Sequence, residues 1–210
     1  MADQMTGLLS PFLRRRRLAA AGPYLRGGQV LDFGCGVGEL ANQIEPERYL
    51  GVDLDRASIE TARTNHPRHR FETLVDFEAR SPAPSFDVIS ALAVIEHLPD
   101  PGTWLCSMGA WLKPDGIIVL TTPHPSMRWV HDCGARVRAF SREAAEEHED
   151  MLDYHALQSI AARAGLRVMR YRRFLPGCNQ LAVVKHRTET TGAESAGAGV
   201  IQKSTESPTS

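Results

Sequence analysis

The sequence of 210 residues lacks the features typical of membrane-spanning or exported proteins. Its longest apolar run, from Val88 to Ile95, is interrupted by Ser90 and is far too short to cross a bilayer. The first ten residues, MADQMTGLLS, have no basic region ahead of an apolar stretch, so we expect no secretory signal. We therefore predict a cytoplasmic protein with no membrane partner.

Closely spaced cysteines are also missing. The four cysteines contain no C-x-x-C pair, and their spacing matches neither a zinc pattern nor a disulfide framework. Unpaired cysteines suit a reducing cytoplasm. The sequence therefore predicts no metal site. The cysteines are Cys35, Cys106, Cys133 and Cys178.

An excess of positive charge is the third absence. Lysine and arginine together number 24 against 25 acidic residues, which gives a formal net charge of −1. Proteins that bind nucleic acid by neutralising phosphates usually carry a clear basic excess, so we expect no nucleic-acid partner. The one dense basic cluster, Arg14 to Arg17, is interpreted mainly as the solvated face of an N-terminal helix.

The residues that are present alternate short β-type runs with helical stretches, which favours βαβ units and a mostly parallel sheet. Only residues 172–179 separate the last two expected strands, too few for a helical crossover, so the last strand should run antiparallel. We predict an α/β, doubly wound, Rossmann-like sheet of seven strands. The expected strands are 29–33, 49–52, 70–74, 86–91, 117–121, 166–171 and 180–186. The expected helices, beside the N-terminal one, are 37–44, 56–65, 101–112 and 152–164, with a turn at 113–116.

Residues 1–187 are expected to form one domain. Within it, residues 122–150 show no clean period and are predicted to form a lid-like insertion. The last segment, 188–210, is rich in Ser, Thr and Gly and has only Val200 and Ile201 as sizeable apolar residues. Such a composition cannot offset the entropy of ordering, so we predict a disordered tail.

The most informative motif is a glycine loop after the first expected strand. In VLDFGCGVGEL, residues 30–40, Gly34, Gly36 and Gly38 stand between a strand and a helix, where bare backbone can approach a ligand. Asp53 follows at the end of the second strand, in GVDLD, where its carboxylate can accept hydrogen bonds from both hydroxyls of a ribose. The loop and the acid together indicate a ligand that contains adenosine.

The glycine spacing argues against a dinucleotide. The dinucleotide fingerprint is G-x-G-x-x-G, whereas here the third glycine comes one place early and Glu39 takes the last position. A carboxylate beside a pyrophosphate would repel it. A G-x-x-x-x-G-K-S/T phosphate loop is missing as well, so an adenosine ligand without phosphate fits best.

Taken together, the motifs resemble those of class I S-adenosylmethionine-dependent methyltransferases, with the small-molecule subgroup typified by the ubiquinone-pathway O-methyltransferases as the most similar. The resemblance extends from about Leu13 to His186. It implies an enzyme that methylates a small molecule with S-adenosylmethionine as cofactor, with O-methylation favoured. The motifs that carry it are VLDFGCGVGEL, GVDLD, FDVISALAVIEHLPDP, WLKPDGIIVLTTP, AGLRV and FLPGCNQLAVVKH.

The resemblance also implies roles for residues of the cofactor site. The glycine loop would lie against the methionine part, with Asp32 on the side of its amine and Asp53 as the ribose acid. Asp76 would receive the adenine amino group, although Glu72 is an alternative for that position. The remaining implied cofactor residues are Arg14, Leu54 and Leu92.

Candidates for the acceptor side follow the fourth and fifth strands, because ligands of open α/β sheets bind beyond the carboxyl ends of the strands. Glu96 and His97 follow the fourth strand, as an acid/base pair or as a wall of the pocket, and His124 follows the fifth. We predict these three as the catalytic residues, with His131 or His148 contributed by the lid.

Several alternatives stay open. The scaffold also supports N- and C-methylation, and the fold does not decide between them. A nucleic-acid methyltransferase is opposed by the near-zero charge and by residues 91–94, which read ALAV where amino-methylating relatives have N/D-P-P-Y/F/W. A non-catalytic, cofactor-binding partner subunit would carry the same glycine loop. Both a monomer and a homodimer are compatible with the sequence.

Overall fold

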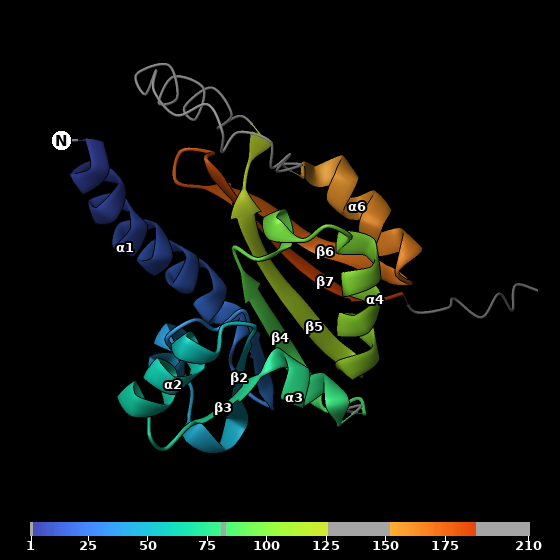
Figure 1. Ribbon diagram of the computed structural model, residues 1–210. Coiled ribbons are helices and arrows are strands. Elements are labelled where there is room, and N and C mark those ends of the chain that lie inside the picture. The colour runs from blue at the N-terminus through green and yellow to red at the C-terminus, as the bar shows by residue number, and fades with distance from the viewer. Residues whose placement is uncertain (1, 81–82, 126–151, 188–210) are drawn as a thin grey trace, which may run out of the picture.

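A computed structural model describes the backbone of residues 2–10 and all of residues 11–80, 83–125 and 152–187. These residues form a seven-stranded sheet in the order β3-β2-β1-β4-β5-β7-β6, with helices on both sides of it (Figure 1). The strands are β1 Val30–Phe33, β2 Tyr49–Asp53, β3 Arg70–Thr73, β4 Phe86–Leu92, β5 Leu112–Pro123, β6 Leu166–Phe174 and β7 Asn179–His186.

The strand directions confirm the predicted topology. Strands β1 to β5 pair in parallel, and β7 lies between β5 and β6 and runs antiparallel to both. Residues 175–178 alone connect β6 to β7, which is enough for a hairpin but not for a crossover. The fold is therefore the expected doubly wound α/β sheet with an antiparallel last strand.

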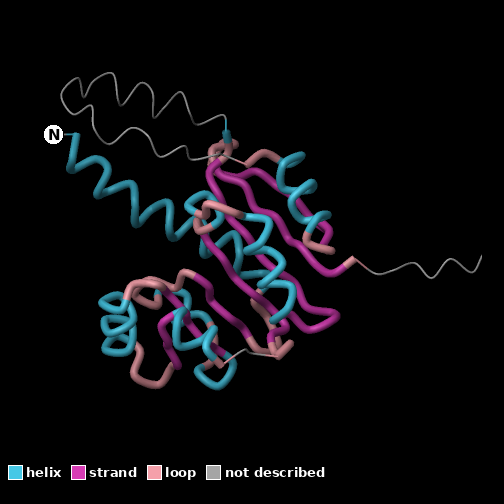
Figure 2. The backbone as a smooth tube through the Cα atoms, turned by 45° about the vertical axis from the view of Figure 1, so that its right-hand side comes forward, coloured by secondary structure: helices cyan, strands magenta, loops and turns pink. Residues whose placement is uncertain are grey.

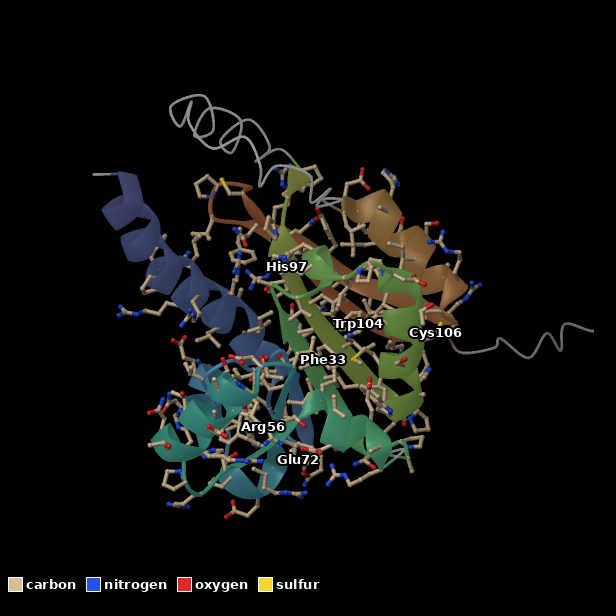
Figure 3. All side chains as sticks on the ribbon, in the orientation of Figure 1. Phe33, Arg56, Glu72, His97, Trp104 and Cys106 are labelled. Carbon is tan, nitrogen blue, oxygen red and sulfur yellow. The ribbon has the colours of Figure 1, made fainter. Side chains whose placement is uncertain are left out.

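The helices cover the two faces of the sheet through two separate apolar clusters. Strand β1 shows the division, because Leu31 and Phe33 belong to the cluster under α4 and α6, whereas Val30 belongs to the cluster under α1 and α2. Figure 3 shows Phe33 and Trp104 of α4 side by side, with ring centroids 5.5 Å apart in an edge-to-face arrangement. The helices are α1 Ala2–Ala21, α2 Arg56–Asn65, α3 Leu74–Ala79, α4 Pro101–Trp111 and α6 Tyr154–Arg163.

One expected helix was predicted too long. Residues 37–44 form only a short 3₁₀ helix, η2, Glu39–Gln43. It begins after Gly38, whose φ of 84° is left-handed, and it ends at Ile44, which is extended. Because Pro46 soon follows, the segment has room for little more than one helical turn.

The structure also contains a helix that the sequence analysis missed. Helix α3 begins at Leu74, and Thr73 caps it by accepting the N–H of Asp76 on its hydroxyl at 3.2 Å. The Thr73 hydroxyl in turn donates to the Asp76 carboxylate at 2.6 Å. This T-x-x-D arrangement is a capping box, a signal present in the sequence that could have predicted the helix.

Strand β5 corrects two further expectations. The predicted turn at residues 113–116 lies inside β5 as an irregularity, because Leu112 pairs with Phe86 but Ile117 pairs with Val88. Thr122 and Pro123, predicted as the start of the insertion, are the last residues of β5. The rest of the predicted lid, with His131 and His148, and the predicted tail lie outside the described residues and stay predictions.

Helix α1 extends from the sheet toward the N-terminus (Figure 2). Its C-terminal end is fixed to β6, an edge strand of the sheet, because the Arg172 side chain donates to the backbone oxygen of Ala20 at 2.9 Å. Within the described part of the chain, no helix is long and apolar enough to cross a membrane.

Candidate cofactor and acceptor site

The glycine loop leaves β1 at its carboxyl end and folds against β2. The backbone N–H groups of Gly34 and Cys35 both donate to the Val52 oxygen, at 2.9 and 3.0 Å. Gly34 has a φ of 73°, and a Cβ there would lie 2.6 Å from Val94 Cγ2, so both conformation and space require glycine. A Cβ on Gly36 would meet nothing within 4 Å, so this part of the loop faces open space.

Asp53 joins the second motif to the loop, as its spacing predicted. Its Oδ2 accepts the N–H of Gly36 at 2.8 Å, and its Oδ1 accepts the N–H of Asp55 at 2.9 Å. A carboxylate has about four lone-pair positions, so further acceptor capacity remains for a ligand. The structure thus brings the glycine loop and the acid of the second strand into direct contact.

Asp32 lies deeper, beneath the loop. It is 4% exposed, and its Oδ2 accepts a hydrogen bond from the Tyr49 hydroxyl at 2.8 Å. Burial raises the pKa of Asp32 to about 7, and repulsion from Asp53 adds to the rise while the Tyr49 hydrogen bond opposes it. The sequence analysis missed Tyr49, because nothing in the spacing of the two residues indicates that β1 and β2 bring them together.

Two apolar side chains stand exposed near Asp53. Leu54 is 75% exposed and follows Asp53, and Val75 is 69% exposed and lies in the first turn of α3. Because Asp53 pairs with Thr73 in the sheet, the two segments leave β2 and β3 at the same edge. Exposed apolar groups beside polar ones suit the flat faces of an aromatic ligand. Leu54 was predicted and Val75 was not.

The two acidic candidates near β3 differ in their surroundings. Glu72 is engaged by Arg80 and, at 3.4 Å, by Arg70. Asp76 is exposed in the first turn of α3, and among the described residues it forms hydrogen bonds with Thr73 alone. Of the two carboxylates left open by the sequence, Asp76 is therefore the more accessible to a ligand.

Arg14 reaches the far end of the glycine loop. Its guanidinium forms an ion pair with Glu39, the residue that stands at the last fingerprint position. Both side chains are about half exposed, 50% and 41%, so solvent screens the pair and it contributes little to stability. The contact nevertheless places Arg14, one of the arginines of the basic cluster, beside the predicted cofactor site.

The three predicted catalytic residues differ in exposure. Glu96 belongs to η4, Ile95–His97, and is 7% exposed, and burial raises its pKa. His97 is exposed and is seen at the end of η4 beside β5 in Figure 3. His124 is half-buried directly after β5, held by its N–H to Cys178 O at 3.0 Å. Burial lowers the pKa of His124, and Arg173 lowers it further, whereas Asp153 opposes them.

Val94 stands two residues before Glu96 and is the side chain that a Cβ on Gly34 would meet. Glu96 therefore follows a residue that packs against the cofactor loop. It also lies close to Thr122 at the end of β5. The structure therefore gathers the carboxyl ends of β4 and β5 beside the glycine loop. Leu92, the last residue of β4, pairs with Thr121 there. In the parts of the chain described, no three His, Cys, Asp or Glu side chains are grouped to hold a metal ion.

Comparison of the sequence with known proteins identifies the family to which it is similar. The family described as methyltransferase domain matches residues 2–171. The ubiquinone biosynthesis O-methyltransferase of Neisseria meningitidis serogroup C (strain 053442) is 35% identical over 107 residues, which are 47% of this chain and 45% of that protein. The enzyme of the same name from Rhodopseudomonas palustris (strain BisA53) is 32% identical over 105 residues, 47% and 41% of the two chains. The matches thus span about half the length of these curated relatives.

Solved structures share the fold at low sequence identity. The PH0226 protein from Pyrococcus horikoshii OT3 has a TM-score of 0.64 at 18% identity, covering 83% of this chain and 91% of that one. The magnesium protoporphyrin IX methyltransferase from Synechocystis PCC 6803 has a TM-score of 0.65 at 13% identity and covers 84% of each chain. These likenesses show the fold alone, whereas the family match over residues 2–171 shows the family. The chain therefore belongs to the methyltransferase domain family, as its motifs predicted.

Proposed function

We propose that the protein transfers a methyl group from S-adenosylmethionine to a hydroxyl oxygen of a small molecule. When bound, the cofactor supplies an electrophilic methyl group on its sulfonium sulfur. The observation that carries the proposal is the buried carboxyl of Glu96, which lies two residues beyond Val94 and so close to the glycine loop. A group able to accept a proton thus stands next to the proposed cofactor groove.

The residues of the groove fit the cofactor. Bare backbone at Gly34 and Gly36 allows the methionine part to approach, and Asp53 retains lone pairs for ribose hydroxyls. The exposed side chains of Leu54 and Val75 offer apolar contact to an adenine ring. We assign the further cofactor contacts to Gly38, Arg14, Asp32, Asp76 and Leu92.

On the acceptor side we assign the proton transfer to His124. Its lowered pKa keeps the imidazole neutral at pH 7, the form that accepts a proton. Glu96 and His97 would border the same space from η4. Methyl transfer depends chiefly on holding nucleophile and methyl in line and on excluding water, so these side chains act mainly by position.

Oxygen is favoured as the nucleophile by the two relatives named ubiquinone biosynthesis O-methyltransferase. A nucleic-acid acceptor is disfavoured by the net charge of −1. A cytoplasmic location is supported by the cysteines in the described regions, Cys35, Cys106 and Cys178, which are free thiols.

The proposal is tested by turnover of purified variants with radiolabelled S-adenosylmethionine. His124→Ala should lower turnover by about 10²–10⁴-fold, the usual contribution of a general base, and should leave the affinity for S-adenosylhomocysteine unchanged. His155→Ala, an exposed histidine on α6, is the matched control and should behave as wild type. Wild-type turnover in His124→Ala would remove His124 from the chemistry. Tight cofactor binding without methylation of any small molecule would instead favour the non-catalytic partner subunit.

A further inference from the structure

Arg17 differs from the other arginines of its cluster. It is half-buried, and its Nε donates to Asn179 Oδ1 at 3.1 Å, where Asn179 is 4% exposed at the start of β7. Its Nη groups make no hydrogen bond or ion pair with any residue that the structure describes. Arg15 and Arg16, by contrast, are exposed. The guanidinium of Arg17 is therefore held in place through Nε, and its Nη groups remain available to a hydrogen-bond acceptor.

Helix α1 presents Arg17 to the carboxyl ends of the central strands. In Figure 1, α1 runs alongside the arrowheads of β4 and β5, and it contacts both strands. The bond from Arg172 to Ala20 fixes the helix one turn beyond Arg17. The orientation of Arg17 thus depends on two separate bonds to the sheet.

Glu96 faces the same space from η4. Arg17 and Glu96 attract one another electrostatically, yet Arg17 forms no ion pair with Glu96 at contact distance among the described residues. The Glu96 Oε2 atom and the Thr122 hydroxyl are fully buried; they lie close to one another and have no other hydrogen-bond partner in the described parts of the chain. Buried polar atoms are nearly always hydrogen-bonded, and one hydroxyl uses little of the acceptor capacity of a carboxylate, so a further donor group fits beside Glu96.

The chemistry of the two side chains defines that group. A guanidinium only donates hydrogen bonds and a carboxylate only accepts them, whereas a hydroxyl does both. An ammonium group cannot accept a hydrogen bond from Arg17, and a carboxylate cannot donate one to Glu96. A neutral alcohol or phenol is the small group that satisfies both.

We propose that Arg17 and Glu96 form a hydroxyl-selective subsite for the methyl acceptor. Before the transfer, the hydroxyl donates to Glu96 Oε2, and its oxygen accepts from the Nη groups of Arg17. As the oxygen takes the methyl group, its proton passes to Glu96 and from there to His124, the group to which the proton transfer is assigned above. This inference rests on the proposed O-methylation and adds to it the pair of residues that selects alcohols and phenols over amines and carboxylates. Arg17, which the sequence analysis treated as part of a solvated charge run, becomes an acceptor-binding residue.

The test uses the full chain, tritiated S-adenosylmethionine and paired probes that differ in one group. The pairs are benzyl alcohol and benzylamine, and 3-hydroxybutyrate and 3-aminobutyrate, whose amino groups are ammonium ions at pH 7. For the hydroxyl probe that the wild type methylates best, Arg17→Met and Glu96→Gln should each raise the KM about 10- to 100-fold, as expected for loss of a hydrogen bond to a charged group. Arg16→Met is the matched control and should keep the wild-type KM.

Affinity for S-adenosylhomocysteine, measured by calorimetry, shows whether each variant is folded, and Arg17→Lys replaces Arg17→Met if the latter is not. Arg17→Lys keeps the charge but loses the planar fork, so a rise in KM is expected there as well. Wild-type KM in a folded Arg17 variant overturns the subsite and leaves the O-methylation proposal standing. Methylation of the amino probes alone, or of none of the probes, overturns both.

Discussion

The carboxylate of Asp53 accepts a hydrogen bond from the backbone N–H of Gly36 at 2.8 Å, and this bond joins two motifs 17 residues apart in the sequence. It connects the end of β2 to the turn after β1, in addition to the bonds from the Gly34 and Cys35 N–H groups to Val52 O. Asp53 therefore shapes the glycine loop, and in the proposed cofactor site its remaining lone pairs would accept the ribose hydroxyls.

The first prediction concerns Asp53→Ala. Removing the Asp53 carboxylate would remove the two proposed charge-assisted hydrogen bonds to a ribose and the bond to Gly36. The binding free energy of S-adenosylhomocysteine should therefore weaken by on the order of 2–4 kcal/mol. Calorimetry measures the change. Asp55→Ala is the control, because Asp55 caps α2 and its loss should reduce stability by about 1 kcal/mol without weakening the cofactor. An unchanged dissociation constant in Asp53→Ala would show that Asp53 does not bind the ribose.

The second prediction separates strain from crowding in the glycine loop. Gly34 and Gly27 have similar left-handed φ values, 73° and 81°, but only at Gly34 would a Cβ strike a neighbour, Val94. Gly27→Ala should cost about 1–2 kcal/mol from conformation alone, and Gly34→Ala about 1–3 kcal/mol more from overpacking. Urea denaturation measures both. The added cost should be smaller in a Gly34→Ala, Val94→Ala double variant, and equal costs in the two single variants would exclude the Val94 contact.

The third prediction follows from the pKa of Asp32, raised from about 3.8 to about 7. Between these values the folded state binds the proton more tightly than the unfolded state, so Asp32 contributes stability that is complete below pH 4 and is lost as the pH rises through 7. Relative to Asp32→Asn, the wild type should lose up to about 4 kcal/mol over this window. Urea denaturation of both proteins from pH 4 to pH 8 measures the difference. A difference that does not change with pH would contradict the raised pKa.

The fourth prediction concerns Gln180, which is fully buried. Its side-chain N–H groups donate to Pro123 O, at 3.0 Å, and to Leu152 O, and its Oε1 accepts the Tyr171 hydroxyl at 2.8 Å. Gln180→Leu keeps the volume but leaves the buried Leu152 oxygen and the half-buried Pro123 and Tyr171 groups unpaired, so it should destabilise the fold by about 2–4 kcal/mol. The exposed Gln158→Leu on α6 should change stability by less than about 0.5 kcal/mol. Equal effects in denaturant would mean that Gln180 is not a structural anchor.

Local signals in the sequence predicted the scaffold well. The glycine loop, the acid of β2 and the short gap before β7 are features of adjacent or regularly spaced residues, so periodicity and turn chemistry were enough. Helix α3 was missed although its capping box was visible in the sequence.

The remaining features depend on contacts between distant segments. Tyr49 reaches Asp32 only because β1 and β2 are neighbours in the sheet, and Arg17 reaches Asn179 across 162 positions of sequence. The sequence alone predicts that the run Arg14 to Arg17 is a solvated face. The packing of α1 against the sheet is needed to show that Arg17 is half-buried. Tertiary contacts of this kind leave no trace in the spacing of a single sequence.

The central claim is that the protein methylates oxygen, and the most direct measurement is the bond that the transferred methyl group forms. The full chain is incubated with S-adenosylmethionine carrying a ¹³C-labelled methyl group and with a small-molecule metabolite extract, and the product is examined by ¹³C nuclear magnetic resonance. We predict a labelled methyl signal at the chemical shift of a methyl ether or ester. A labelled methyl bonded only to nitrogen, carbon or sulfur would contradict the account.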